Sequence, residues 1–195
     1  VTLSNLQRQI LHATDSAGTA KTDSASCRLK ALNPAVEITT ATERLTPDNA
    51  LALLEKCDLA VDASDNYAAR FALADACAAL RIPLVHGAVK GFIGQATVFA
   101  PHEGTACYRC LFPEETPMQE EDTASAAGIL GAHAGIIGCI QALEALKALA
   151  GIPSPLRGGL LSADTLRMRF TVIPLHPSPT CKCRNGGGGG AAMKN

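Results

Sequence analysis

The sequence predicts an α/β fold whose sheet is parallel in its N-terminal part and antiparallel in its C-terminal half. Between residues 21 and 90, short apolar runs alternate with helix-length segments, a pattern typical of parallel strands joined by helices. Beyond Gly91 this rhythm stops, and strand-like segments are separated by a single long helical segment. The chain has 195 residues, enough for one well-buried domain, whereas two domains would be cramped.

The elements of the first half are bounded by ordinary start and stop signals. Residues 21–32 (KTDSASCRLKAL) predict a helix that ends at Asn33, because the residue before a proline disfavours the helical conformation. Residues 36–42 (VEITTAT) alternate as a strand does. A second helix is expected over residues 46–56, with Pro47 tolerated in its first turn. The remaining elements are a buried parallel strand at 59–64 (LAVDAS), a helix at 66–80 and a strand that begins at Pro83 (PLVHGAV).

The second half predicts three strands, one long helix and two polar segments. The strands are expected at residues 94–101, 159–164 and 166–175. A polar, acidic loop at 113–123 precedes the long helix, which runs from about 126 to 150. The end of the chain, NGGGGGAAMKN, is of low complexity. We therefore expect one domain over residues 1–184 and a flexible, glycine-rich tail over 185–195.

The long helix raises the question of a membrane span. Residues 124–143 contain no formal charge and reach the length of a spanning helix. They also contain His133, Gln141 and four glycines, and the same helix continues into a segment with Glu144 and Lys147. We interpret the segment as a buried or subunit-interface helix rather than as a membrane span.

Charge and cysteine usage restrict the class of protein. The 17 basic and 18 acidic residues nearly cancel, so no basic surface for nucleic acid is indicated. No signal peptide is visible, and the eight cysteines are scattered over helix-like segments, which favours a reducing cytoplasm over a disulfide framework. The first residue is Val1 and not methionine, which suggests that a preceding segment is missing.

The strongest local signal for chemistry is DASDN, residues 62–66, directly after a predicted parallel strand. Open α/β sheets bind their ligands at the carboxyl ends of such strands. Asp65 is a candidate magnesium ligand, because Mg²⁺ prefers carboxylate oxygens. It could equally cap the helix that begins near Asn66, and position alone leaves both interpretations open. Asp62 is a candidate supporting carboxylate.

Two cations lie close together near the start of the chain. Arg8 belongs to the segment SNLQRQILH, residues 4–12, and Lys21 follows thirteen residues later. If both faced Asp65, the three groups would form a metal-plus-cation clamp suited to a triphosphate. Taken singly, each cation is more often a solvated surface charge, so the hypothesis depends on all three occurring together.

The cysteines fall into two groups. Cys107 and Cys110 have the spacing of a zinc knuckle, and Cys181 and Cys183 supply two further thiols. Two close pairs favour a closed structural Zn²⁺ site, although a CxxC pair alone is also compatible with a redox role. The remaining cysteines are expected to be inert buried thiols; they are Cys27, Cys57, Cys77 and Cys139.

Taken together, these motifs resemble the ThiF/MoeB/HesA family, the bacterial relatives of ubiquitin-activating enzymes. The resemblance spans residues 1–183 and is carried, in order, by SNLQRQILH, Lys21, LNPAVEI, DLAVDASDN, CYRCLFP and GIIGCIQALEALKALAG. It implies a Rossmann-like, doubly wound sheet, a structural zinc site and a homodimer. It also implies an adenylyltransferase that uses Mg-ATP to activate the C-terminal Gly-Gly carboxylate of a ubiquitin-like sulfur carrier for molybdopterin or thiamine synthesis.

The resemblance assigns roles to residues by position. Lys21 corresponds to the phosphate-binding lysine of the family. Asp65 and Asn66 correspond to its metal and nucleotide contacts. The nucleotide-contacting segment corresponds to Ser4, Asn5, Leu6, Gln7 and Arg8. The zinc ligands correspond to Cys107, Cys110, Cys181 and Cys183.

The candidate residues are of the types that an adenylation reaction needs. A C-terminal carboxylate has an ordinary pKa of about 3.3–3.7 and is already an anion at neutral pH, so it needs no general base to attack the α-phosphate. The enzyme must supply alignment and charge neutralisation, because an anion approaches a polyanion. Arg8, Lys21 and a magnesium ion on Asp65 are groups of the right kind.

Three departures from the family pattern qualify the resemblance. The strand–GxGxxG–helix unit that opens the family would precede Val1, so this chain alone is expected to bind ATP poorly. Ala124 stands where many relatives have a reactive cysteine, which favours a MoeB-like, adenylation-only role. The last cysteine pair is CxC where relatives usually have CxxC.

Two other functions are alternatives to adenylation. The chain could be a zinc-stabilised scaffold that docks the sulfur carrier without chemistry, which the missing glycine-rich unit would favour. A nicotinamide-dependent oxidoreductase would keep the fold, but neither its dinucleotide fingerprint nor a hydride-transfer site is present in the sequence. Which sulfur carrier is served is not encoded in these motifs.

Overall fold

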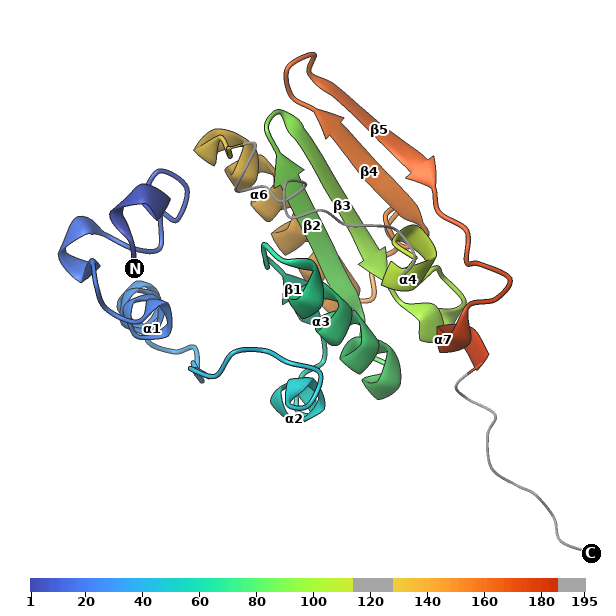
Figure 1. The fold of residues 1–195 in the computed structure, drawn as a ribbon, viewed down its shortest axis with the longest axis horizontal. Helices are drawn as coiled ribbons and strands as arrows, with labels where there is room; N and C mark the ends of the chain where they lie inside the picture. Colours follow the sequence, from blue (N-terminus) through green and yellow to red (C-terminus); the bar gives the residue numbers. More distant parts are fainter. Residues whose placement is uncertain (114–127, 186–195) are drawn as a thin grey trace, which may run out of the picture.

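The computed structural model describes residues 1–113 and 128–185, and it is organised around one five-stranded sheet (Figure 1). The strand order is β1-β2-β3-β4-β5. Among the described strands, only β1 and β2 are parallel, and the other neighbours are antiparallel. This arrangement confirms the predicted mixed sheet. The strands are β1 (Ala60–Asp62), β2 (Leu84–Lys90), β3 (Ile93–Phe99), β4 (Gly159–Asp164) and β5 (Arg169–Pro174).

The helices agree with the sequence patterns at the longest elements. The α-helices are α1 (Lys21–Leu32), α2 (Ala50–Leu54), α3 (Tyr67–Leu80), α4 (Tyr108–Leu111), α6 (Gly131–Leu149) and α7 (Lys182–Asn185), and the 3₁₀ turns are η1 (Leu3–Asn5), η2 (Thr14–Ser16) and η3 (Pro101–Glu103). The predictions for α1 and α3 are confirmed, whereas α2 is shorter than the expected 46–56. None of the described helices is long and apolar enough to cross a membrane.

Both faces of the central strands are covered by helices, as in a doubly wound sheet. Leu84 of β2 packs with Leu73 and Cys77 of α3 in one hydrophobic cluster. The next residue, Val85, belongs to a second cluster, against which Ile140 of α6 packs. Successive side chains of a strand point to opposite faces, so α3 and α6 cover opposite faces of β2. Burial on both sides therefore explains why Leu84 and Val85, which point to opposite faces, are both apolar.

The strand predicted at residues 36–42 is wrong. These residues form no strand and no helix, and Val36 is 52% exposed. In Figure 1 this stretch runs between α1 and α2, away from the sheet. A strand needs a neighbour to satisfy its backbone groups, and no described strand pairs with this segment. An alternating sequence pattern alone therefore predicted a strand that does not form.

Four sequence-based expectations fall wholly or partly outside the described residues. The acidic loop lies there beyond residue 113, and Ala124 lies there too. So do residues 126–127 of the expected long helix, which in the described part begins at Gly131. The glycine-rich tail is described only at residue 185.

Candidate functional site

One cavity brings the predicted carboxylate and cations together. It has a volume of about 480 Å³, within the range of small-molecule sites. Asn5, Arg8 and Lys21 line it from the N-terminal segment, and Asp65 lines it from the loop after β1. Helix α6 closes another side through residues that include Ile137 and Gln141. The further lining residues are Gln9, Ala63, Ser64, Arg70, Gly87, Ala88, Val89, Ile129, Ala134 and Gly138.

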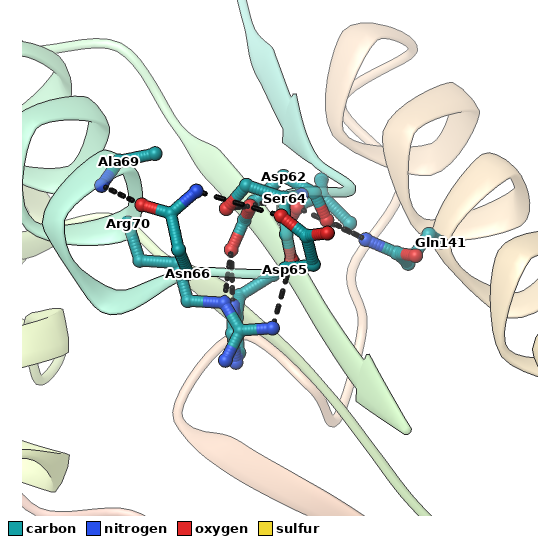
Figure 2. Close-up of polar contacts among 9 residues, drawn as sticks. Asp62, Ser64, Asp65, Asn66, Ala69, Arg70 and Gln141 are labelled. Carbon is teal, nitrogen blue, oxygen red and sulfur yellow. Dashed lines mark hydrogen bonds and ion pairs between the residues drawn. The ribbon is translucent and has the colours of Figure 1, made fainter. Parts of the chain in front are cut away.

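Asp65 lies between the end of β1 and the start of α3, with its side chain exposed. The interpretation of Asp65 as the helix cap is wrong, because its neighbour takes that role. Oδ1 of Asn66 accepts a hydrogen bond of 2.9 Å from the backbone N–H of Ala69 (Figure 2). Asp65 is thus left open to the cavity beside the positive end of a helix dipole, a setting that favours anions.

Asp62 is the buried anchor of the same loop. Its side chain is 1% exposed, and Oδ1 accepts hydrogen bonds from the Ser64 backbone N–H at 2.9 Å and hydroxyl at 2.6 Å. Nδ1 of His86 lies 2.7 Å from Oδ2. Burial by itself raises the pKa of Asp62, but the contacts with His86 and Ser64 outweigh it and hold the pKa below its ordinary value. Asp62 therefore supports the loop as a carboxylate, as the sequence suggested.

Arg70 is a cavity cation that the sequence analysis missed. Its guanidinium donates a 2.8 Å hydrogen bond to the Ser64 carbonyl, and Nε lies 3.7 Å from Oδ2 of Asp62. It also lies over the Tyr67 ring, 5.6 Å from the centroid. The signal was present in the sequence, because a cation near the N-terminus of a helix opposes the helix dipole and calls for a local anion.

The two predicted cations reach the cavity from different local structures. Arg8 follows η1, and its guanidinium donates a 2.8 Å hydrogen bond to Oδ1 of Asn5. Lys21 is the first residue of α1 and has an exposed side chain. The structure thus brings Arg8, Lys21 and Asp65 to one cavity, as their combination in the sequence required. Their individual roles stay predictions.

Four other residues assigned by resemblance do not line this cavity: Ser4, Leu6, Gln7 and Asn66. Gln7 instead donates from Nε2 to the Ile129 carbonyl at 3.0 Å, which joins the N-terminal segment to the residues before α6. The N-terminal segment therefore has a structural contact with the helix as well as cavity-lining residues.

The predicted zinc ligands form a separate cluster near α4 and α7. The sulfur of Cys107 lies 3.5 Å from that of Cys181 and 3.6 Å from that of Cys110. The sulfurs of Cys107, Cys181 and Cys183 all lie within 4.8 Å of one another. Four sulfurs on a tetrahedral zinc with Zn–S bonds of about 2.3 Å would be about 3.8 Å apart. The separations of Cys107 from Cys181 and from Cys110 are close to this value, but Cys110 does not belong to the group of three mutually close sulfurs. The CxC spacing brings both of its thiols to the cluster.

Burial, followed by the contact with Cys181, raises the pKa of the Cys107 thiol. The expectation that the other cysteines are buried is wrong for Cys27, Cys57 and Cys139, which are exposed, and right only for Cys77. A helix-like sequence context did not show which face each thiol occupies.

Comparison with known proteins adds family information to this geometry. The sequence profile described as the ThiF family matches residues 1–185. The adenylyltransferase and sulfurtransferase MOCS3-2 of Zea mays is 42% identical over 182 residues, 93% of this chain and 38% of the maize protein. The sulfur carrier protein adenylyltransferase of Thermus thermophilus is 42% identical over 187 residues, 93% of this chain and 68% of its own length.

The fold recurs in solved structures. A crystal structure of E. coli MccB with ATP superposes with a TM-score of 0.75 at 17% identity, over 94% of this chain and 56% of that one. At this identity the likeness concerns the fold. The chain thus spans about two fifths of the maize relative and just over half of the MccB chain.

Proposed function

This chain belongs to the ThiF family, and we propose that the protein adenylates the C-terminal Gly-Gly carboxylate of a ubiquitin-like sulfur carrier. The observation that carries the proposal is the cavity in which Arg8, Lys21 and Asp65 meet. Relatives named adenylyltransferases support it, one of them for a sulfur carrier protein. The chain spans about two fifths of the maize relative, and the proposal concerns the activity of the whole protein.

The reaction is a displacement at the α-phosphorus of ATP. A carboxylate oxygen of the carrier forms a bond to phosphorus, the bond between the α-phosphorus and the bridging oxygen breaks, and pyrophosphate leaves with its electrons. The product is an acyl-adenylate. No proton has to be removed, because the carboxylate is ionised at neutral pH.

The cavity residues supply alignment and positive charge for this step. Arg8 and Lys21 pair with the phosphates, whose negative charge would otherwise repel the incoming carboxylate. Arg70, fixed by Ser64 and Asp62, adds a third cation to the same cavity. The absence of a nucleophilic side chain from this scheme is consistent with the chemistry, since the substrate itself is the nucleophile.

Two metal ions accompany the proposal. Asp65 would hold Mg²⁺, and its single exposed carboxylate suits this ion, which is commonly held by one or two carboxylates together with substrate phosphates. When bound, the ion would neutralise phosphate charge. A structural Zn²⁺ would be held by Cys107, Cys181 and Cys183, with Cys110, whose sulfur lies beside that of Cys107, as the fourth ligand.

Cysteine usage favours action in the cytoplasm. The resemblance implies that the protein acts as a homodimer, in molybdopterin or thiamine synthesis. It performs adenylation without a covalent relay from residue 124, which is alanine.

Pyrophosphate exchange into ATP tests the proposal. The full-length protein should exchange labelled pyrophosphate only when a carrier ending in Gly-Gly is added. Arg8→Ala and Asp65→Asn should each reduce exchange by at least about a hundredfold, the size expected when a charge-stabilising group is lost. Asp58→Asn is the matched control, because Asp58 is exposed and does not line the cavity.

Each result has a clear meaning. Exchange that is unchanged in both cavity variants contradicts the assigned roles. Tight carrier binding without any exchange by the wild-type protein identifies the non-catalytic scaffold instead.

A further inference from the structure

We propose that Gln141 of α6 is a positioning residue that fixes the strand end from which the Asp65 loop departs. This inference rests on the proposed function, because it concerns how the same cavity is held in shape. It assigns a role to a buried, uncharged side chain that the chemistry of adenylation does not require directly.

Gln141 ties together the two parallel strands at the cavity. Its side-chain Nε2 donates a 2.7 Å hydrogen bond to the backbone carbonyl of Asp62 on β1 (Figure 2). The same nitrogen lies 3.4 Å from the carbonyl of Val85 on β2. Gln141 is only 6% exposed, so these bonds are shielded from water, and a lost donor would leave buried carbonyls unsatisfied.

Strand β2 has a glycine where the side-chain amide of Gln141 packs against it. Gly87 of β2 lies under Gln141, and a Cβ placed there would fall 2.3 Å from Cδ and 2.4 Å from Oε1 of Gln141. Gly87 has no positive φ angle, so its backbone conformation does not require glycine. The contact with Gln141 does.

Asp62 connects the contact with Gln141 to the loop that carries Asp65. It is the last residue of β1, a strand of three residues that pairs, among the described strands, only with β2. Gln141 donates a hydrogen bond to the carbonyl of Asp62, and His86 and Ser64 contact its carboxylate. Three residues later the chain reaches Asp65. Without the Gln141 amide, this short edge strand loses its bond to α6.

The same helix also meets the segment that carries the cations. At its first residue, Gly131, a Cβ would fall 2.0 Å from the backbone carbonyl oxygen of Gln7. Gln141 lies ten residues, roughly 15 Å, further along α6. A single rigid helix therefore contacts the neighbour of Arg8 at one point and the strand of Asp65 at another. The structure thus makes α6 the element that relates the two halves of the cavity.

Gln141→Met in the full-length protein is the first test. Methionine has the same length and no donor, so it removes the bridge with little change in volume. We expect kcat/KM for Mg-ATP to fall at least about tenfold, because displacement of a positioning contact by about 1 Å is costly. The KM for the carrier should not change, because the loop that Gln141 holds carries Asp65, the proposed ligand of the Mg²⁺ that accompanies ATP.

Thr97→Val is the matched control. Thr97 is 1% exposed, and its hydroxyl also donates to two backbone carbonyls, those of Gly159 at 2.8 Å and Leu156 at 3.2 Å. It does not line the cavity. Both variants should lower Tm by similar amounts, but only Gln141→Met should change kcat/KM for Mg-ATP. Equal kinetic effects of the two variants would reduce Gln141 to a merely stabilising residue and overturn the proposal.

Gly87→Ala tests the same contact from the other side. The added Cβ should displace the Gln141 amide and reproduce the kinetic defect of Gln141→Met. In a Gln141→Ala background, where the space is vacant, Gly87→Ala should add little. A defect of the same size in both backgrounds contradicts a role of Gly87 through Gln141.

Amide hydrogen exchange separates this inference from the proposed function. In Gln141→Met, peptides that cover residues 60–66 should exchange faster than in the wild type, whereas peptides from the buried part of α3 should not change. Unchanged exchange over 60–66 overturns the positioning role, whether or not the protein adenylates. A wild-type protein without adenylation refutes the proposed function, and the exchange result still decides whether Gln141 anchors the loop.

Discussion

Asp62 and Asp65 are three residues apart and have the same side chain, but they differ in burial and in their contacts. Asp62 is buried and fully engaged by His86 and Ser64, whereas Asp65 is exposed and faces the cavity. The sequence indicated the pair, because both follow a buried strand. It could not assign the cap correctly, since Asp and Asn are equally good caps and only the backbone at Asn66 decides between them.

Asp62→Asn should destabilise the protein in a pH-dependent way. The folded-state pKa of Asp62 is lowered, so its ionised form contributes stability above the unfolded-state pKa of about 3.9. That contribution is lost as the pH falls through the lower folded-state value. We expect the variant to lose about 1.5–3 kcal/mol near pH 7, the range for hydrogen bonds to charged groups. Urea unfolding between pH 3 and 7 measures the difference.

Asp164→Asn is the control for this experiment. The pKa of Asp164 is also lowered, by the hydrogen bond from Arg167, but this ion pair lies at the surface. Its replacement should change stability little, and added salt should reduce the effect further. A difference for Asp62→Asn that grows as the pH falls would contradict the assigned ionisation state.

At the scale of elements, the sequence predicts best where periodicity and punctuation agree. Helix α3 has a polar start, an apolar face and a defined end, and its predicted range, 66–80, differs only at the cap residue. The segment 36–42 has alternation without a neighbouring strand, and it forms none. Pairing is a tertiary property, so no local pattern could settle it. The same holds for Gln141, whose partners lie 56 and 79 residues away.

The first turn of α3 offers a test of the two roles suggested for Asn66. Asn66→Ala removes the bond to the Ala69 N–H and should cost about 1 kcal/mol of stability. Asn66→Asp keeps an acceptor at the cap and should retain most of that stability. Thermal unfolding of both variants measures the effect. If Asn66→Asp unfolds like Asn66→Ala, the side chain does not act as the cap.

A nucleotide contact of Asn66, as the resemblance assigned, would give a different result. Asn66→Asp would then keep its stability but raise the KM for ATP, because an added carboxylate repels phosphate. Because Asn66 does not line the cavity, we expect KM to remain close to that of the wild type.

At the scale of the whole molecule, the cavity and the thiol cluster both join segments that are distant in sequence. The cavity combines the first 21 residues with the loop after β1 and with α6. The thiols join the segment at Cys107, which follows β3, to Cys181, which follows β5. The residue types could be identified from the sequence and the resemblance. Their convergence could not be derived from local patterns. The place of Arg70 near the N-terminus of a predicted helix indicated a nearby anion, but no local pattern identified that anion as Asp62.

The thiol cluster predicts one zinc per chain. Cys107→Ser should abolish zinc binding and lower Tm markedly, because a structural zinc contributes directly to folding. Cys139→Ser should change neither, since Cys139 is exposed on α6 and does not belong to the cluster. Elemental analysis of protein purified without chelators measures the metal. Equal zinc content in both variants would exclude Cys107 as a ligand.

In the proposed function, the cavity holds ATP for attack by a carrier carboxylate. The most direct measurement is the intact mass of a Gly-Gly-terminated carrier after incubation with the full-length protein and Mg-ATP. We predict that the carrier gains the mass of one adenylyl group, and that Asp65→Asn prevents this gain. A carrier of unchanged mass with the wild-type protein, or an equal gain with Asp65→Asn, would contradict the account.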